Sequence, residues 1–247
     1  MKNLKFIVFV VLAIFIPAVL SAITGKEILD KSEAVMKAPK SVVSDAVMVL
    51  IDKRNKKKTR KIRMWSKGSK KKVIKFLSPA DVRGVGLLVL SDNDMYLYMP
   101  AFKKIRRIAS HVKHQSFMGS DFSYDEIGST EYAENYTAKL VKETDTEYIV
   151  EAVRKKNSDK QYNKLKLRID KQSFLPLKIE MYKKNKLRKV LINNKIEKIG
   201  KYWMATDIMI EDIKKKHKTN LKLTNIKFDK SVPSRIFTKR YLTKSVR

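Results

Sequence analysis

The stretch KLKLRIDKQSFLPLKIEMY, residues 164–182, alternates apolar and polar side chains on either side of the turn DKQS, residues 170–173. Successive side chains of an extended chain point to opposite faces, so Leu165, Leu167 and Ile169 share one face and basic residues take the other. After the turn, four apolar residues are predicted to share a face: Leu175, Leu177, Ile179 and Met181. Two such strands form an antiparallel hairpin with one apolar and one hydrated face.

The same period recurs in other parts of the chain. In residues 202–212 it places four side chains on one face: Met204, Thr206, Ile208 and Ile210. In NLKLTNIKF, residues 220–228, the apolar positions change phase at Thr224–Asn225, which predicts a β-bulge. Strands this regularly amphipathic do not suit a parallel sheet. We therefore expect a mainly β protein with short helices and roughly ten or eleven antiparallel strands in a meander or barrel.

One predicted hairpin has a different pattern. Its two segments, GLLVL (residues 86–90) and MYLYMP (residues 95–100), are apolar on both faces. Strands of this kind are covered on both sides, either at the centre of a sheet or under a helix. The pattern leaves open which face of the 87–99 hairpin points inward.

The beginning of the chain has the features of a secretory signal peptide, residues 1–22. Two lysines precede the apolar run Phe6–Leu20, and the small residues Ser21 and Ala22 follow it. An uncleaved anchor is the alternative, but about fifteen apolar residues are short for a membrane span, which needs about 20. We therefore expect an exported protein with a single domain, residues 23–247.

A short helix is predicted at the start of that domain. Thr24 and Glu27 have the spacing of a capping box, the residues up to Lys37 favour a helix, and Pro39 ends it. The chain has no cysteine, so a lipid-modified N-terminal cysteine and disulfides are both excluded. The stability of the domain must therefore come from its core.

The chain is strongly basic, with a formal net charge of +31. Such a charge normally suggests nucleic acid, but an export signal argues against that partner. Outside the cytoplasm the available anions are lipid headgroups, glycolipids and wall polymers, so an anionic membrane surface is the partner that the charge favours. The alternative is a basic surface that is merely hydrated.

The sequence contains no motif typical of an enzyme, a cofactor site or a metal site. His111 and His114 have a spacing that zinc ligands can use, but cysteine is absent and HExxH does not occur, so two incidental histidines in a polar loop are favoured. GxSxG is absent, and RGVGLL (residues 83–88) lacks the third glycine of a dinucleotide fingerprint. We expect a protein that is not an enzyme and carries no cofactor.

The segment SFMGSDFSYDEI, residues 116–127, differs from the chain around it, and we call it the acidic segment. No lysine or arginine occurs between His114 and Ala138. Gly119 permits a sharp turn, and either Ser120 or Asp121 is expected to cap one helical turn. Its acids are expected to pair with two residues of the preceding strand, Arg106 and Arg107.

Several segments together resemble the outer-membrane lipoprotein-sorting family, the LolA-like periplasmic proteins. FLSPADVRGVGLLVL (residues 76–90) and MYLYMPAFKKIRRI (95–108) precede the acidic segment, and RIDKQSFLPLKIEMY (168–182) and SVPSRIFTKRYLTK (231–244) follow it. The resemblance covers nearly all of residues 24–247, and it is closer to a less characterised branch of the family. It implies a half-open antiparallel β-barrel over short helices that enclose an apolar cavity for acyl chains.

What the resemblance implies about function is transport of lipid or lipoprotein through the periplasm to the outer membrane. Many members are encoded with RND-type exporters, so it implies such a membrane transporter as a partner. We expect the acidic segment to close one end of the cavity, through Phe117, Met118, Phe122 and Tyr124. The expected cavity wall consists of Leu88, Leu90, Tyr96 and Tyr98.

Three alternatives remain open at this point. The acidic segment is either a lid or an ordered loop that completes the core, because aromatic residues are more often core than ligand contacts. The protein is either a carrier or a lipid-sensing or transporter-accessory module that uses its basic surface. A periplasmic enzyme with an unrecognised site is the third class, and the absence of paired catalytic groups disfavours it.

Overall fold

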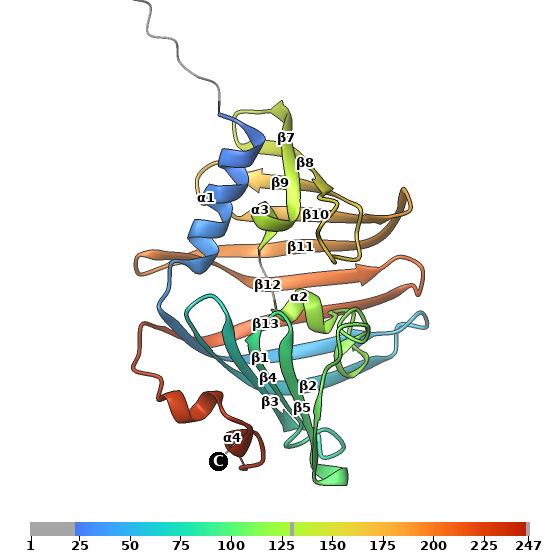
Figure 1. The fold of residues 1–247 in the computed structure, drawn as a ribbon, viewed down its shortest axis with the longest axis vertical. Helices are drawn as coiled ribbons and strands as arrows, with labels where there is room; N and C mark the ends of the chain where they lie inside the picture. Colours follow the sequence, from blue (N-terminus) through green and yellow to red (C-terminus); the bar gives the residue numbers. More distant parts are fainter. Residues whose placement is uncertain (1–22, 129–130, 246–247) are drawn as a thin grey trace, which may run out of the picture.

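A computed structural model describes residues 23–128 and 131–245 (Figure 1). Its strands form one 13-stranded sheet in the order β6-β5-β4-β3-β2-β1-β13-β12-β11-β10-β9-β8-β7, with antiparallel neighbours throughout. The prediction of a mainly β, antiparallel protein is confirmed. The expected number of strands, ten or eleven, was too low, because the sheet has 13. The predicted signal peptide, residues 1–22, lies outside the described residues.

The elements have the following bounds. The strands are β1 (Ser41–Ile51), β2 (Lys57–Lys67), β3 (Lys71–Ser78), β4 (Gly86–Ser91), β5 (Asp94–Met99), β6 (Lys104–Arg107), β7 (Tyr136–Glu143), β8 (Glu147–Arg154), β9 (Lys164–Asp170), β10 (Pro176–Lys183), β11 (Lys186–Ile199), β12 (Tyr202–Asp212) and β13 (His217–Phe228). The helices are α1 (Gly25–Lys37), α2 (Tyr124–Gly128), α3 (Tyr132–Asn135) and α4 (Lys239–Leu242). Three short 3-10 turns are η1 (Pro100–Phe102), η2 (Phe117–Gly119) and η3 (Ser234–Phe237). Within the described ranges, no helix has the length and apolar character needed to cross a membrane.

Helix α1 begins as predicted. Thr24 Oγ1 accepts a hydrogen bond from the Glu27 amide at 3.2 Å, and the Glu27 carboxylate accepts one from the Thr24 amide at 2.8 Å. This capping box satisfies two of the amide groups that a helix leaves unpaired at its start. Ile28 and Leu29 are then buried against the sheet. The helix therefore lies across the β7 end of the sheet (Figure 1).

The sheet has two covered faces. The inner face is the one covered by α1, α2 and α3, and it carries two apolar clusters: one on β1–β5 and β13, the other mainly on β8–β10. Phe122 contacts both of these clusters. The outer face is covered near β3 and β4 by the C-terminal segment, residues 232–242, through Val232, Phe237 and Leu242.

The alternation predicted from the sequence is largely present. Leu165, Leu167 and Ile169 are buried in the inner face, whereas Leu177 is only half-buried because the pairing of β10 with β9 shifts between Pro176 and Lys178. The predicted bulge in β13 is confirmed, because its register with β1 shifts there and Asn225 adopts a left-handed φ of 52°.

The β4–β5 hairpin is covered on both faces, as expected. It lies near one end of the sheet and beneath the C-terminal segment, so the second alternative, cover by a helix, is the one observed. Four of its residues belong to the inner face: Leu87, Val89, Met95 and Leu97. Gly86 permits the close cover on the outer face, since a Cβ atom there would lie 2.9 Å from Leu242 Cδ2.

Lys75 fixes the C-terminal segment to the outer face. Its side chain is fully buried, and its Nζ donates to the carbonyl oxygens of Tyr241, at 3.0 Å, and Lys244. Burial lowers the pKa of Lys75 to about 8. No carboxylate in the described part of the chain compensates for the lost hydration of the Lys75 ammonium group. Burial therefore disfavours its charged form relative to its neutral form.

Stability should therefore depend on pH through Lys75. Between its folded pKa of about 8 and the value of 10.5 for an unperturbed lysine, the unfolded chain binds more protons at this position, so raising the pH favours the folded state. We expect the wild type to gain about 1.4 kcal/mol per pH unit in this window relative to Lys75→Met. Denaturant unfolding from about pH 7 to about pH 10 measures the difference, with the exposed Lys71→Met on the same strand as control. A difference between wild type and Lys75→Met that stays constant with pH contradicts the assignment.

Candidate functional site

The acidic segment forms a closed loop followed by helix α2. Ser116 bridges Ser123, and the Phe117 amide donates to the Phe122 carbonyl at 2.8 Å. Met118 and Gly119 turn the chain with left-handed φ values of 51° and 76°. The sharp turn expected at Gly119 is therefore present, and it begins one residue earlier.

The residue that caps α2 differs from the prediction. Ser123 Oγ accepts from the Glu126 amide at 3.2 Å, and the Glu126 carboxylate accepts from the Ser123 amide at 2.7 Å. Ser120 donates to the Phe117 carbonyl, and Asp121 bonds to the sheet, so neither caps the helix. The sequence contains this signal, since Ser123 and Glu126 have the spacing of a capping box.

The aromatic side chains of the segment pack into the inner face. Phe117 is fully buried, with its ring centroid 5.6 Å from that of Phe76 and 5.5 Å from that of Tyr124. Met118 and Phe122 are half-buried against the same cluster. The four predicted lid residues are thus together on the inner face.

Asp121 fixes the middle of the segment to β13. Its carboxylate Oδ2 accepts from Thr219 Oγ1 at 2.7 Å and lies 2.6 Å from His217 Nδ1. Its amide donates to Thr219 Oγ1 at 2.9 Å. The Asp121 side chain is only 2% exposed, so these bonds compensate for the loss of its hydration.

Lys189 of β11 holds the segment at two points. Its Nζ donates to the Asp121 carbonyl at 2.6 Å and lies 3.0 Å from both oxygens of the Glu126 carboxylate. Tyr162 donates its hydroxyl to the same carboxylate at 2.9 Å, and burial raises the pKa of Tyr162. A buried lysine with this many acceptors is a strong local restraint.

The predicted partners of the acids were wrong. Asp125 Oδ1 lies 2.8 Å from Lys160 Nζ, and its other oxygen lies 3.9 Å from His114 Nδ1. Burial lowers the pKa of His114, which favours its neutral form. Arg107 instead pairs with Asp94 at 3.6 Å, and Arg106 is exposed.

Two cations from the other half of the sheet also hold the segment. Arg60 of β2 donates to the Met118 carbonyl at 2.5 Å. Lys72 of β3 donates to the carbonyls of Ile127 and Gly128 at 2.8 and 3.1 Å, and burial lowers its pKa to about 8. The acidic segment thus spans the inner face, with polar contacts to β2 and β3 on one side and β11 and β13 on the other.

The residues expected as the cavity wall lie on the opposite face. Leu88, Leu90, Tyr96 and Tyr98 pack under the C-terminal segment, and the sheet separates them from Phe117. The inner residues of the same hairpin take the expected place beneath the segment. Sequence reasoning also missed the anchoring residues Arg60, Lys72, Lys189 and Thr219, because lysine and arginine occur throughout this chain.

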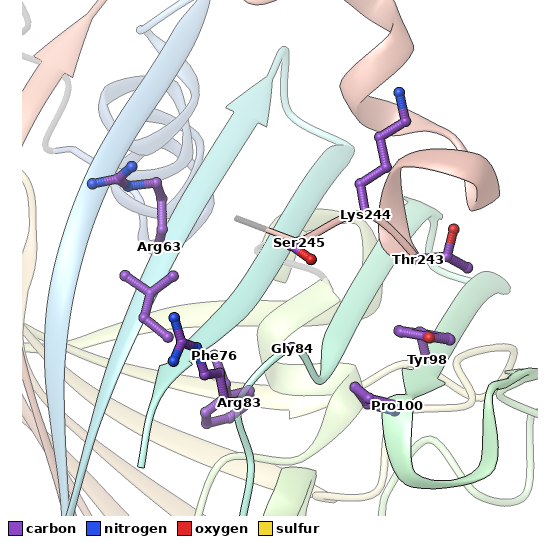
Figure 2. Close-up of a pocket in the computed structure, with 10 residues that line it drawn as sticks. Arg63, Phe76, Arg83, Gly84, Tyr98, Pro100, Thr243, Lys244 and Ser245 are labelled. Atoms are coloured by element: carbon purple, nitrogen blue, oxygen red, sulfur yellow. The ribbon is translucent and has the colours of Figure 1, made fainter. Parts of the chain in front are cut away.

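Two surface pockets lie on the outer face. The larger, of about 530 Å³, is lined by Arg63, Phe76, Leu77, Arg83, Gly84, Tyr98, Pro100, Thr243, Lys244 and Ser245 (Figure 2). A second pocket, of about 370 Å³, shares Arg63, whose guanidinium is bound by Asp45 and lowers the pKa of that carboxyl group. Residues 23–128 and 131–245 contain no cluster of His, Asp or Glu suited to a metal ion.

Comparison with known proteins identifies the relatives of this chain. A family model described as an uncharacterized protein matches residues 68–244. The chain belongs to this family of uncharacterized proteins. No match was found among curated proteins.

Solved structures from three bacteria share the fold. A DUF1329 family protein from Desulfovibrio piger is 29% identical, with a TM-score of 0.83, over 88% of this chain and 97% of that one. A putative outer membrane lipoprotein-sorting protein domain from Vibrio parahaemolyticus is 27% identical, with a TM-score of 0.81, over 89% of this chain and 98% of that one. A LolA superfamily protein from Nitrosomonas europaea is 22% identical, with a TM-score of 0.72, over 89% and 100%. The resemblance to lipoprotein-sorting proteins and the LolA-like fold are confirmed.

Proposed function

We propose that this family member is a periplasmic carrier that binds the acyl chains of a lipid or lipoprotein between the inner face of the sheet and the acidic segment. Transfer toward the outer membrane, with an RND-type transporter as donor or partner, is the process that this activity serves. The protein acts by binding and release and needs no catalytic group, cofactor or metal.

The attachment of the acidic segment carries the proposal. Its underside consists of apolar side chains, with Phe117 fully buried, while its edges are held by hydrogen bonds and ion pairs to four strands. When the segment lifts, each of these polar groups can exchange its protein partner for water, so the open form leaves none of them without a hydrogen bond.

Opening would expose an apolar surface suited to acyl chains. Beneath the segment lie Leu87, Val89 and Met95 of the β4–β5 hairpin, together with Phe76. Burial of each CH₂ group contributes about 0.8 kcal/mol, so a 16-carbon chain gains on the order of 10 kcal/mol before entropy costs. On this proposal the described structure is the closed form, and Phe117 and Phe122 occupy the position of the acyl chain.

The similarity to a putative outer membrane lipoprotein-sorting domain at 27% identity supports the same function. The alternative is a transporter-accessory or lipid-sensing module that uses its basic surface and keeps its interior closed. The net charge of +31 favours that alternative only if the acidic segment does not open.

Phe122→Asp is the variant that tests the proposal. Phe122 contacts both inner clusters, so a carboxylate there places a charge in the path of the acyl chain. We expect loss of binding to a fluorescent fatty acid, while circular dichroism shows an intact sheet. Phe174→Asp is the matched control, because Phe174 is also half-buried, stacks on Tyr148 and already has a φ of 55° that aspartate tolerates.

Two outcomes count against the proposal. If Phe122→Asp unfolds the whole protein while Phe174→Asp does not, Phe122 is a core residue. If it folds and binds the fatty acid with unchanged affinity, the acidic segment does not cover the binding site. Mass spectrometry of lipids that co-purify with the wild type would identify the cargo.

A further inference from the structure

The turn that follows β5 presents an aromatic residue to solvent. Phe102 is 61% exposed, the highest value among the large hydrophobic side chains exposed in the described residues. It belongs to η1, the short green turn at the lower end of the molecule in Figure 1. A single exposed hydrophobic residue is common on a protein surface, so the surroundings of Phe102 decide whether it has a role.

The turn holds Phe102 in place. Pro100 starts η1, and the Lys103 amide donates back to the Pro100 carbonyl at 3.0 Å. Lys103 closes the turn with a left-handed φ of 49°. Gly84 packs so near the Pro100 ring that a Cβ atom would lie 3.1 Å from Pro100 Cγ. The backbone that carries the aromatic ring is therefore held in a defined turn.

Basic residues surround Phe102. Exposed cations follow it directly in the turn and along the edge strand β6: Lys103, Lys104, Arg106 and Arg107. Arg107 pairs with Asp94, whereas the other three have no ion-pair partner within residues 23–128 and 131–245. An aromatic side chain among unpaired cations combines the two contributions that hold a protein at the surface of an anionic bilayer: apolar insertion and attraction to phosphate.

The larger outer pocket opens beside the same turn. Pro100 and Tyr98 line it together with Arg83, Lys244 and Arg63, and the last of these is paired with Asp45 (Figure 2). The positive charge thus continues from β6 into a cleft of about 530 Å³, which is large enough for a phosphorylated headgroup.

We propose that the β5–β6 turn is a membrane-docking site: Phe102 enters the interface of an anionic phospholipid bilayer, while Lys103, Lys104 and Arg106 contact lipid phosphates. This site lies on the turn, apart from the inner face where acyl chains are proposed to bind, so the two proposals can fail separately. It gives the carrier a defined orientation at the bilayer.

Tryptophan fluorescence tests insertion directly. In Phe102→Trp, the emission of the added tryptophan, obtained by subtracting the wild-type spectrum, should shift to the blue with vesicles of phosphatidylglycerol and phosphatidylcholine. Vesicles of phosphatidylcholine alone should give little shift, and salt should weaken the effect because it screens exposed charges. Val153→Trp is the matched control, because Val153 is 50% exposed on β8, far along the sheet from β6.

Vesicle co-sedimentation measures affinity. We expect Phe102→Ser to weaken binding to the anionic vesicles about tenfold, and Val153→Ser to leave it unchanged. Charge reversal in Lys104→Glu should weaken binding further and reduce its salt dependence. All variants are compared in the same N-terminal form, so any contribution of residues 1–22 cancels.

The outcomes are distinct. Equal affinities of wild type and Phe102→Ser, or no blue shift of the added tryptophan in Phe102→Trp on anionic vesicles, overturn the docking site. Equal binding to anionic and neutral vesicles overturns the role of the cations. The Phe102, Lys104 and Val153 variants should bind fatty acid as the wild type does when no vesicles are present. Loss of fatty-acid binding in Phe122→Asp tests the carrier proposal and says nothing about the docking site.

Discussion

Replacing Phe117 with alanine is expected to weaken the closed position of the acidic segment by about 3–5 kcal/mol. The side chain is fully buried and packs against Phe76 and Tyr124, so its removal leaves a cavity that the sheet below cannot fill by relaxation. This loss destabilises the contact between the acidic segment and the sheet. The sheet itself is affected less, because its strands keep their own hydrogen bonds. The open form should therefore become more populated by more than about a hundredfold.

Hydrogen exchange distinguishes local opening from global unfolding. In Phe117→Ala, amides of residues 117–127 should exchange faster by that factor, while amides of β9 and β10 keep their wild-type rates. Leu167→Ala is the control, because Leu167 is also fully buried but belongs to the sheet, so its loss should accelerate exchange in β9 and β10 as well. If Phe117→Ala accelerates β9 and β10 as strongly as the acidic segment, the segment belongs to the cooperative core and cannot act as a lid.

The parts of the fold that the sequence predicts are those fixed by local patterns. Alternation over Lys164–Asp170 requires only that one face of a strand is buried, and the capping box at Thr24 joins residues three positions apart. The bulge at Asn225 is visible because a change of phase moves the apolar positions to the other side of the strand. In each case the determining residues lie next to one another in the chain.

The features that sequence analysis misplaced depend on contacts between distant residues. Both faces of the β4–β5 hairpin are apolar, so its pattern is the same whether Leu87 or Leu88 points inward. The C-terminal segment determines which face points outward. Its Leu242, more than a hundred residues away in the sequence, packs in one cluster with Leu88. The four expected wall residues therefore lie on the outer face, and the pattern of the hairpin alone leaves its orientation open.

The acids of the segment illustrate the same limit. Arg106 and Arg107 were expected as partners because they are near in sequence, but the sheet brings in Lys189 and Thr219, which are 68 and 98 positions away from Asp121. In a chain with 56 lysine and arginine residues, composition does not indicate which cation is buried. What the sequence does show is the absence of lysine within the segment, and the structure explains it: its acids meet cations supplied by the sheet and by the loop between β8 and β9.

Among those cations, Lys189 should have the largest effect on closure. Lys189→Met keeps most of the side-chain volume but removes the donor for the Asp121 carbonyl and the charge opposite Glu126. Among the described residues, Glu126 is then held by the Tyr162 hydroxyl and the Ser123 amide. A buried charge that has lost its partner destabilises a protein by about 3–5 kcal/mol. This loss should again destabilise the closed segment more than the sheet.

Two further variants determine whether the loss comes from this pair. Lys195→Met, on the same strand, removes an exposed lysine paired with Glu197 and should cost at most about 1 kcal/mol. Adding Glu126→Gln to Lys189→Met should recover part of the lost stability, because the unpaired charge is gone. Under the carrier proposal, Lys189→Met also binds and releases a fluorescent fatty acid faster than the wild type in stopped-flow measurements, since opening precedes both steps. Unchanged rates in a variant whose acidic segment exchanges faster would show that acyl chains, if they bind, reach their site by another route.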